Sequence, residues 1–113
     1  MTDFAPDFSR PYKGVPYEVR HERERRLEEK QYRASITGRK IVPQEPCCCC
    51  GKAVRLDRPH NTVMVIRGGA EFEVEGMTEA DWGDWIGALP VGSDCLRKVR
   101  KALPNVKVNR EGE

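Results

Sequence analysis

The sequence predicts a small α+β domain that carries an N-terminal extended arm and a charged helix. β-Branched and alternating residues over 62–75 indicate a hairpin, and apolar residues at helical spacing over 95–103 indicate a final helix. Only 38% of the 113 residues are hydrophobic, which leaves a thin core, and small domains of that kind usually need a disulfide, a metal or a partner. We therefore expect an arm and helix over 1–45, a stabilised domain over 46–104 and a polar tail over 105–113.

The first 17 residues combine prolines and a glycine with aromatic side chains. Prolines at this density exclude a helix and predict an extended arm. Purely disordered tails rarely contain several aromatic residues. We therefore expect the arm to dock, either on its own domain or on another molecule, through Phe4, Phe8, Tyr12 and Tyr17.

Residues 18–35 predict a helix, because helix-forming residues dominate and neither glycine nor proline interrupts them. Glu22 and Glu29 each precede an arginine by four positions, an ion-pair spacing that stabilises helices. The apolar residues form only a broken stripe, so this helix is expected to bury little of its surface. Gly38 marks its expected end, and a proline-containing loop follows.

Two strands are predicted in the middle of the chain. Residues 62–67 are β-branched and apolar, and residues 70–75 alternate, with three glutamates on one face. The pair Gly68-Gly69 between them is a strong signal for a two-residue hairpin turn. Residues 53–56 indicate a further short strand.

Two helices are predicted after the hairpin. Thr78 can cap a short one that contains Trp82 and Trp85, a pair more typical of a lid on a small core than of a binding site. The last helix covers residues 95–103, with apolar residues on one face and basic residues on the rest. The polar residues after 105 are expected to fray.

The chain begins with acids and proline and not with the apolar stretch of a secretory signal, and no run approaches the ~18 apolar residues of a membrane span. We therefore expect a cytoplasmic protein with no membrane partner. Thiols stay reduced in the cytoplasm, and the five cysteines are an odd number. Both observations favour metal binding over disulfides.

The motif Cys47-x-x-Cys50-Gly51 is the strongest signal in the chain. Two intervening residues let both sulfurs face one ion from a tight turn, and the glycine permits the left-handed backbone that such a zinc knuckle needs. Structural zinc takes four ligands. Cys95 lies in the first turn of the last predicted helix, where the helix dipole favours a thiolate. These three cysteines predict a structural zinc ion.

The sequence leaves the fourth ligand open. His60 is favoured, because imidazole is a good zinc ligand and because it follows the knuckle closely. The alternatives are Cys48, Cys49, Asp94 or a water molecule. The competing interpretation of the cysteine run is a buried or reactive cluster of thiols that holds no metal.

The order of knuckle, hairpin and helix with a ligand in its first turn resembles the treble-clef family of zinc folds, over residues 46–103. The helix of that family usually gives two ligands, whereas the helix predicted here offers Cys95 alone beside Asp94.

A second resemblance rests on Cys50-Gly51-Lys52, on the strand and turn over 63–69 and on the late motif Gly92-Ser93-Asp94-Cys95. In these features the chain is similar to small zinc-binding proteins encoded by phages and other mobile elements. The similarity implies a mobile-element origin but no activity, and it does not extend to residues 1–45.

The motifs of hydrolytic and deaminating zinc enzymes are missing from the sequence. Neither His21 nor His60 begins a His-x-Glu motif, and an ion held by three cysteines is a poor Lewis acid. No Gly-x-Ser-x-Gly, phosphate-binding or dinucleotide-binding motif occurs. We therefore predict a protein that is not an enzyme, with no catalytic residues and no small-molecule substrate.

Two functions agree with this pattern. The first is a protein-binding module whose arm and charged helix wrap a partner, which the phage-like resemblance implies to be a host complex such as defence or transcription machinery. The second is a nucleic-acid-binding module that uses the basic residues of the charged helix and of the last helix. Glutamates dilute the charge of the first of these helices, so protein binding is preferred. The partner contacts expected beyond the arm are Arg23, Arg25, Arg26, Arg33, Arg97, Arg100 and Lys101.

Overall fold

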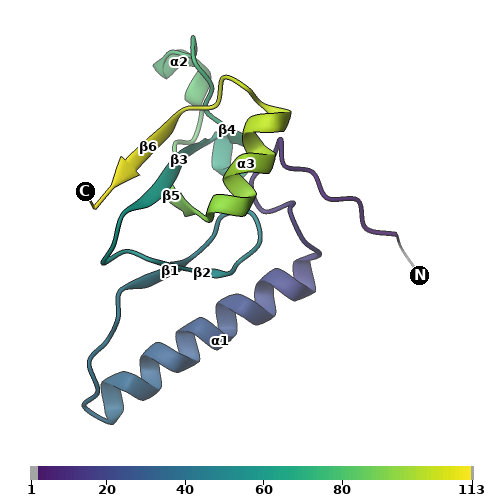
Figure 1. Cartoon of the computed structure of the whole chain (residues 1–113). Helices are drawn as coiled ribbons and strands as arrows, with labels where there is room; N and C mark the ends of the chain where they lie inside the picture. Colours follow the sequence, from purple (N-terminus) through teal and green to yellow (C-terminus); the bar gives the residue numbers. More distant parts are fainter. Residues whose placement is uncertain (1–2, 113) are drawn as a thin grey trace.

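The computed structural model describes residues 3–112 and shows a small domain of mixed helices and sheets (Figure 1). The fold class predicted from the sequence is thereby confirmed at this level. In chain order the elements are α1 (Tyr17–Ile36), β1 (Gln44–Pro46), β2 (Ala53–Arg55), β3 (His60–Ile66), a 3-10 turn (Arg67–Gly69), β4 (Glu71–Phe72), α2 (Glu79–Trp82), β5 (Gly87–Val91), α3 (Ser93–Ala102) and β6 (Val108–Glu111).

The long strand β3 lies at the centre of the larger sheet. It pairs antiparallel with β5 along one edge, and with β4 and then β6 along the other. Val63 and Val65 of β3 are fully buried, as expected for an apolar β-branched strand that is covered by neighbours. One face of α3 packs onto this core through Leu96 and Val99, the two apolar residues at i and i+3.

The predicted hairpin is confirmed, with Val65 opposite Phe72. Its turn is longer than the two residues predicted, because Ile66 pairs with Glu71 and residues 67–70 connect the strands. Both glycines of this turn have positive φ. The second strand of the hairpin is shorter than the alternating pattern suggests. Glu73 is 2% exposed and its carboxylate accepts a hydrogen bond from Lys107 Nζ at 2.9 Å. Although it shares a face of the alternating segment with Glu71 and Glu75, Glu73 is therefore buried, and the ammonium group of Lys107 neutralises its carboxylate.

Several elements lie where the sequence predicts irregular chain. β1 contains a proline and pairs with β2, and β5 pairs with β3 although it contains a proline. The residues after 105 were expected to fray, but Val106 is buried and β6 pairs with β3. A strand that gains its partner only from a distant segment carries little local signal.

The N-terminal arm docks on its own domain. The backbone N–H of Tyr12 donates to the carbonyl of Cys48 at 2.7 Å, and that of Gly14 donates to the carbonyl of Cys49 at 3.1 Å. Phe8 and Tyr12 pack against the core and are half-buried. Of the four aromatic residues expected to reach a partner, only Phe4 and Tyr17 are exposed.

Helix α1 confirms the predicted charged helix and extends away from the larger sheet, with the small β1–β2 sheet between them (Figure 1). Among its residues, all of which the structure describes, Leu27 alone is buried. The side chains of Arg23 and Gln31 donate to the backbone carbonyls of Cys50 and Gln44, at 2.9 and 3.0 Å. The helix is thus held along one narrow line, and most of its surface faces solvent.

The tryptophan pair stacks, with ring centroids 6.3 Å apart, but Trp85 is 53% exposed. This residue therefore does not lie over the core as a lid. Across residues 3–112, none of the helices combines the length and the apolar character that crossing a bilayer requires.

Candidate metal centre

The cysteine run forms a tight turn between β1 and β2. The N–H of Cys47 donates to the carbonyl of Lys52 at 2.7 Å, and the N–H of Gly51 donates to the carbonyl of Cys47 at 2.9 Å. Gly51 has φ +80°, the left-handed conformation that the Cys-x-x-Cys-Gly motif predicts. This turn brings the side chains of Cys47 and Cys50 to one side, as a metal-binding knuckle requires.

Helix α3 supplies the third thiol. The sulfurs of Cys47, Cys50 and Cys95 all lie within 4.8 Å of one another, and all three residues are buried. The N–H of Gly92, directly before α3, donates to the sulfur of Cys47 at 3.3 Å and so positions the first turn of the helix against the knuckle. Residues 45 positions apart in the chain, Cys50 and Cys95, therefore meet in one cluster.

The cluster has one sulfur that is favoured as a thiolate. Neighbouring thiols donate to the sulfur of Cys47 and lower its pKa, Cys49 foremost, and the N–H of Gly92 acts in the same direction. The contact with Cys47 is also the largest cause that raises the pKa of each of its neighbours, Cys49, Cys50 and Cys95. A metal ligand must be a thiolate, and the lowered pKa of Cys47 favours that form.

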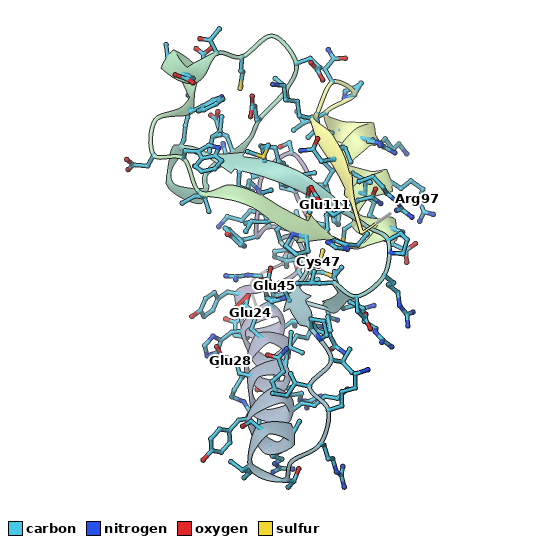
Figure 2. The ribbon with its side chains drawn as sticks, turned by 90° about the vertical axis from the view of Figure 1, so that its left-hand side faces the viewer. Glu24, Glu28, Glu45, Cys47, Arg97 and Glu111 are labelled. Carbon is cyan, nitrogen blue, oxygen red and sulfur yellow. The ribbon has the colours of Figure 1, made fainter. Side chains whose placement is uncertain are left out.

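The donor set fits a metal ion. All five cysteines are free thiols, so none of the three clustered sulfurs is used in a disulfide. Thiolates are soft ligands, which suit zinc, copper(I) and iron. Figure 2 labels Cys47 where the larger sheet meets the small sheet above α1, so an ion at this point would tie both parts of the domain together.

The structure does not bring His60 to these thiols, contrary to the preferred choice of fourth ligand. His60 begins β3 opposite Glu111 of β6, and its Nδ1 lies 2.8 Å from the carbonyl oxygen of Arg58. Its place on a paired strand therefore directs it into a local hydrogen bond. The carboxylate of Asp94 also faces solvent, where it pairs with Arg97 at 3.6 Å.

Most arginines predicted to contact a partner are already paired. Arg25 and Arg26 both bind Glu22, and Arg33 binds Glu29 at 2.6 Å. On α3, Arg100 is exposed near the C-terminal end, and Lys101 follows it into solvent.

A cleft of about 390 Å³ lies beside the thiols, and the sequence interpretation did not predict it. Cys47, Cys50 and Cys95 line it, together with three cationic side chains and one acidic one: Arg23, Lys52, Lys98 and Asp94. Lys98 follows Cys95 by three positions on α3, so the helical spacing places both on one face. That spacing is the signal that could have placed Lys98 beside Cys95 from the sequence.

Comparison of the chain with family models, with curated proteins and with solved structures finds no match. What the cluster does must therefore be inferred from its own chemistry. Three convergent, buried and disulfide-free thiols that join two separate parts of the domain could hold a metal ion.

Proposed function

We propose that this chain is a non-enzymatic, cytoplasmic protein-binding module whose fold depends on one zinc ion bound by Cys47, Cys50 and Cys95. The observation that carries the proposal is the convergence of these three sulfurs within 4.8 Å of one another. Zinc suits the site because it has no redox chemistry and accepts thiolates in a tetrahedron. A knuckle, a hairpin and a helix that meet at the ion would make the domain treble-clef-like.

The metal serves the fold and not a reaction in this proposal. Three thiolates donate strongly to the ion, which makes it a weak Lewis acid. A small domain with a thin core gains most of its stability from such a centre, and metal binding and folding then become one process.

Helix α1 is the proposed partner surface. It extends away from the domain, and exposed apolar side chains lie on it and on the loop after it: Tyr32 is 65% exposed, Ile36 64% and Ile41 49%. Because the arginines of α1 are largely ion-paired within the helix, its surface carries little free positive charge. Apolar side chains surrounded by paired charges favour a protein partner over a polyanion.

The identity of the partner rests on the resemblance to small zinc proteins of phages and mobile elements. Such an origin makes a host protein complex, in defence or transcription machinery, the proposed target. The treble-clef-like domain would then act as the rigid support that presents α1 to that complex.

Two measurements test the proposal. Elemental analysis of the purified chain is expected to give one equivalent of zinc, and a chelator is expected to unfold the domain as followed by circular dichroism. Less than about half an equivalent, with no structural change on chelation, would overturn the zinc part.

The partner surface is tested by capture from a host lysate. The double variant Tyr32→Ser with Ile36→Ser is expected to lose the captured complex. Trp85→Ser is the matched control, because Trp85 is also exposed but lies in the loop after α2, away from α1. Equal recovery with all three proteins would show that α1 is not the binding surface.

Nucleic-acid binding is the second candidate, supported by one observation. A hollow of about 620 Å³ at the C-terminal end of α1 has five basic residues in its lining, with Glu29 as the acidic one. They are Arg26, Lys30, Arg33, Arg39 and Lys40. Affinity for DNA or RNA that persists above ~150 mM salt would favour this function, whereas affinity lost below that concentration would mark the contact as non-specific.

A further inference from the structure

The cleft of about 390 Å³ beside the thiols is bounded by segments that are distant from one another in the sequence. Phe8 and Val15 come from the arm, Arg23 from α1 and Lys98 from α3, while the knuckle and β2 form the remaining side. The cleft can be located at Cys47 in Figure 2. Small-molecule sites commonly have volumes of about 300–1,000 Å³, so the cleft is large enough for a compact ligand.

Two of the cations in the lining are held in position by neighbours that also line the cleft. Arg23 Nη1 donates to the carbonyl of Cys50 at 2.9 Å, which leaves further N–H groups of its guanidinium for a ligand. The ammonium of Lys98 lies 5.1 Å from the centroid of the Phe8 ring. Both charged groups therefore lie at the cleft itself, and these contacts limit their motion before a ligand arrives, which lowers the entropic cost of binding.

The cations of this cleft have no carboxylate partners. Within residues 3–112, neither Arg23, Lys52 nor Lys98 forms an ion pair, whereas cations that do so elsewhere are Arg10, Arg20, Arg25, Arg26, Arg33, Arg55, Arg67, Arg97 and Lys107. Asp94, the acidic residue of the lining, pairs instead with Arg97 at 3.6 Å. The cleft thus presents positive charge that the described part of the chain does not neutralise directly.

The proposed metal centre does not account for all of this charge. Three thiolates and one divalent ion carry a net charge of about −1, and Asp94 adds one further negative charge. The three cations exceed that sum by about one charge, and by about two where the thiols are protonated and hold no metal. A cavity lined by an excess of one sign of charge concentrates ions of the opposite sign, so the cleft is suited to an anion.

The rest of the lining indicates the kind of anion. Phe8, Val15 and Val54 are half-buried apolar side chains of the same cleft. A matching ligand therefore combines an anionic head with an apolar body. A phosphate monoester fits the head, because it carries a charge of about −1.5 to −2 and several acceptor oxygens, which an arginine and two lysines can share.

We propose that this cleft binds a small organic phosphate monoester. The phosphate group lies between Arg23, Lys52 and Lys98. The apolar body lies against Phe8 and Val15. The proposal goes beyond the protein-binding function and involves no catalytic step. A ligand held at once by the arm, α1, the knuckle and α3 stabilises the docked arrangement of all these segments, so binding strengthens the hold of the domain on α1.

Titration of the full chain, as purified, with phenyl phosphate tests the proposal by NMR. Saturable shifts are expected at the backbone amides of Val15, Val54 and Cys95, which line the cleft. Inorganic phosphate has the same head without the apolar body, and it is expected to bind about tenfold more weakly because no ring is buried. Equally tight binding of inorganic phosphate would overturn the assigned ligand class.

Two other results of the titration would overturn the site. One is the absence of saturable binding of phenyl phosphate, and the other is a set of shifts confined to the basic hollow of about 620 Å³ at the C-terminal end of α1. A chain that contains zinc but fails to bind phenyl phosphate would leave the proposed function intact. The zinc content of the same sample therefore separates the two proposals.

Lysine variants identify the cations that hold the phosphate. Lys52→Gln and Lys98→Gln are each expected to weaken phenyl phosphate binding about fivefold, and unchanged affinity in both would overturn the proposal. Lys52 is exposed, and its substitution keeps the backbone bond from Cys47 that shapes the knuckle. Lys101→Gln is the matched control, because Lys101 lies exposed on the same helix as Lys98 but outside the lining of the cleft. An equal loss of affinity in Lys101→Gln would show diffuse attraction to net charge and overturn the cleft as the site.

Discussion

Replacing Leu27 by alanine tests how α1 is held to the domain. Leu27 is 7% exposed and is the single buried residue of α1, a helix whose residues are all described. Leucine-to-alanine changes in cores cost about 2–5 kcal/mol. Because α1 lies at the margin, where neighbouring side chains and water can fill the space, we expect a loss near the low end, about 2 kcal/mol.

That loss should fall on the docking of α1 and leave the sheet intact. Further ties of the helix are the stacking of Arg20 over the Tyr12 ring, at 4.9 Å from the ring centroid, and the hydrogen bonds from Arg23 and Gln31 to backbone carbonyls. Each of these hydrogen bonds contributes about 1 kcal/mol or somewhat more. A loss of about 2 kcal/mol raises the undocked population about 30-fold. Undocked helices of this length are only marginally stable, so α1 would exchange its amide hydrogens faster.

Hydrogen exchange measured residue by residue is the assay. Amides of α1 are expected to exchange about 30-fold faster in Leu27→Ala, while those of Val63 and Val65 in β3 keep their protection. Val19→Ala is the control on the same helix, because Val19 is 38% exposed and its truncation leaves the docking contact in place. Equal loss of protection in α1 and β3 would refute the reasoning, since it would show that the helix and the sheet unfold together.

Two further predictions concern the knuckle and the charged helix. Gly51→Ala should destabilise the domain more than Gly38→Ala, as measured by urea unfolding. Both glycines have positive φ, so both substitutions share a backbone cost of about 1–2 kcal/mol. Only at Gly51 would the new Cβ also be crowded, because it would lie 3.0 Å from the backbone oxygen of Arg20, whereas nothing lies within 4 Å at Gly38. An equal loss of stability in the two variants would show that the backbone of the knuckle and of Arg20 shifts to accommodate the new Cβ at little cost. Hydrogen bonds from Arg25 and Arg26 lower the pKa of Glu22 from 4.5 to about 2, so these pairs stabilise α1 above pH 4.5 and are lost as the pH falls toward 2. The helical circular dichroism signal should therefore decline over that range, less steeply in Glu22→Gln, and an identical decline in both proteins would contradict the assignment.

The sequence predicts best those elements whose stability is local. The charged helix over 18–35 appears as Tyr17–Ile36, because its helix formers and ion-pair spacing act within the segment itself. A turn at Gly68-Gly69 also appears, although it is longer than predicted, because glycine adopts positive φ at little cost. The Cys-x-x-Cys-Gly turn follows the same rule at Gly51.

Features that depend on distant partners could not be predicted in this way. β5 and β6 are strands because each pairs with β3, one on either edge. Neither segment has a sequence pattern that predicts a strand. The choice of His60 as fourth ligand relied on proximity in sequence, but β-pairing directs that residue to the far end of β3 from the hairpin turn.

The separation of the cluster's two halves along the chain has a consequence during synthesis. Ribosomes add about 5–20 residues per second, and Cys95 follows Cys50 by 45 positions, so the first sulfurs are made about 2–9 s before the last. Through that interval the nascent polypeptide exposes the thiols of residues 47–50 to solvent, because Cys95 has not yet been synthesised. Oxidants and competing ions thus have their best access before translation ends, and newly made molecules should be more sensitive to both than mature ones.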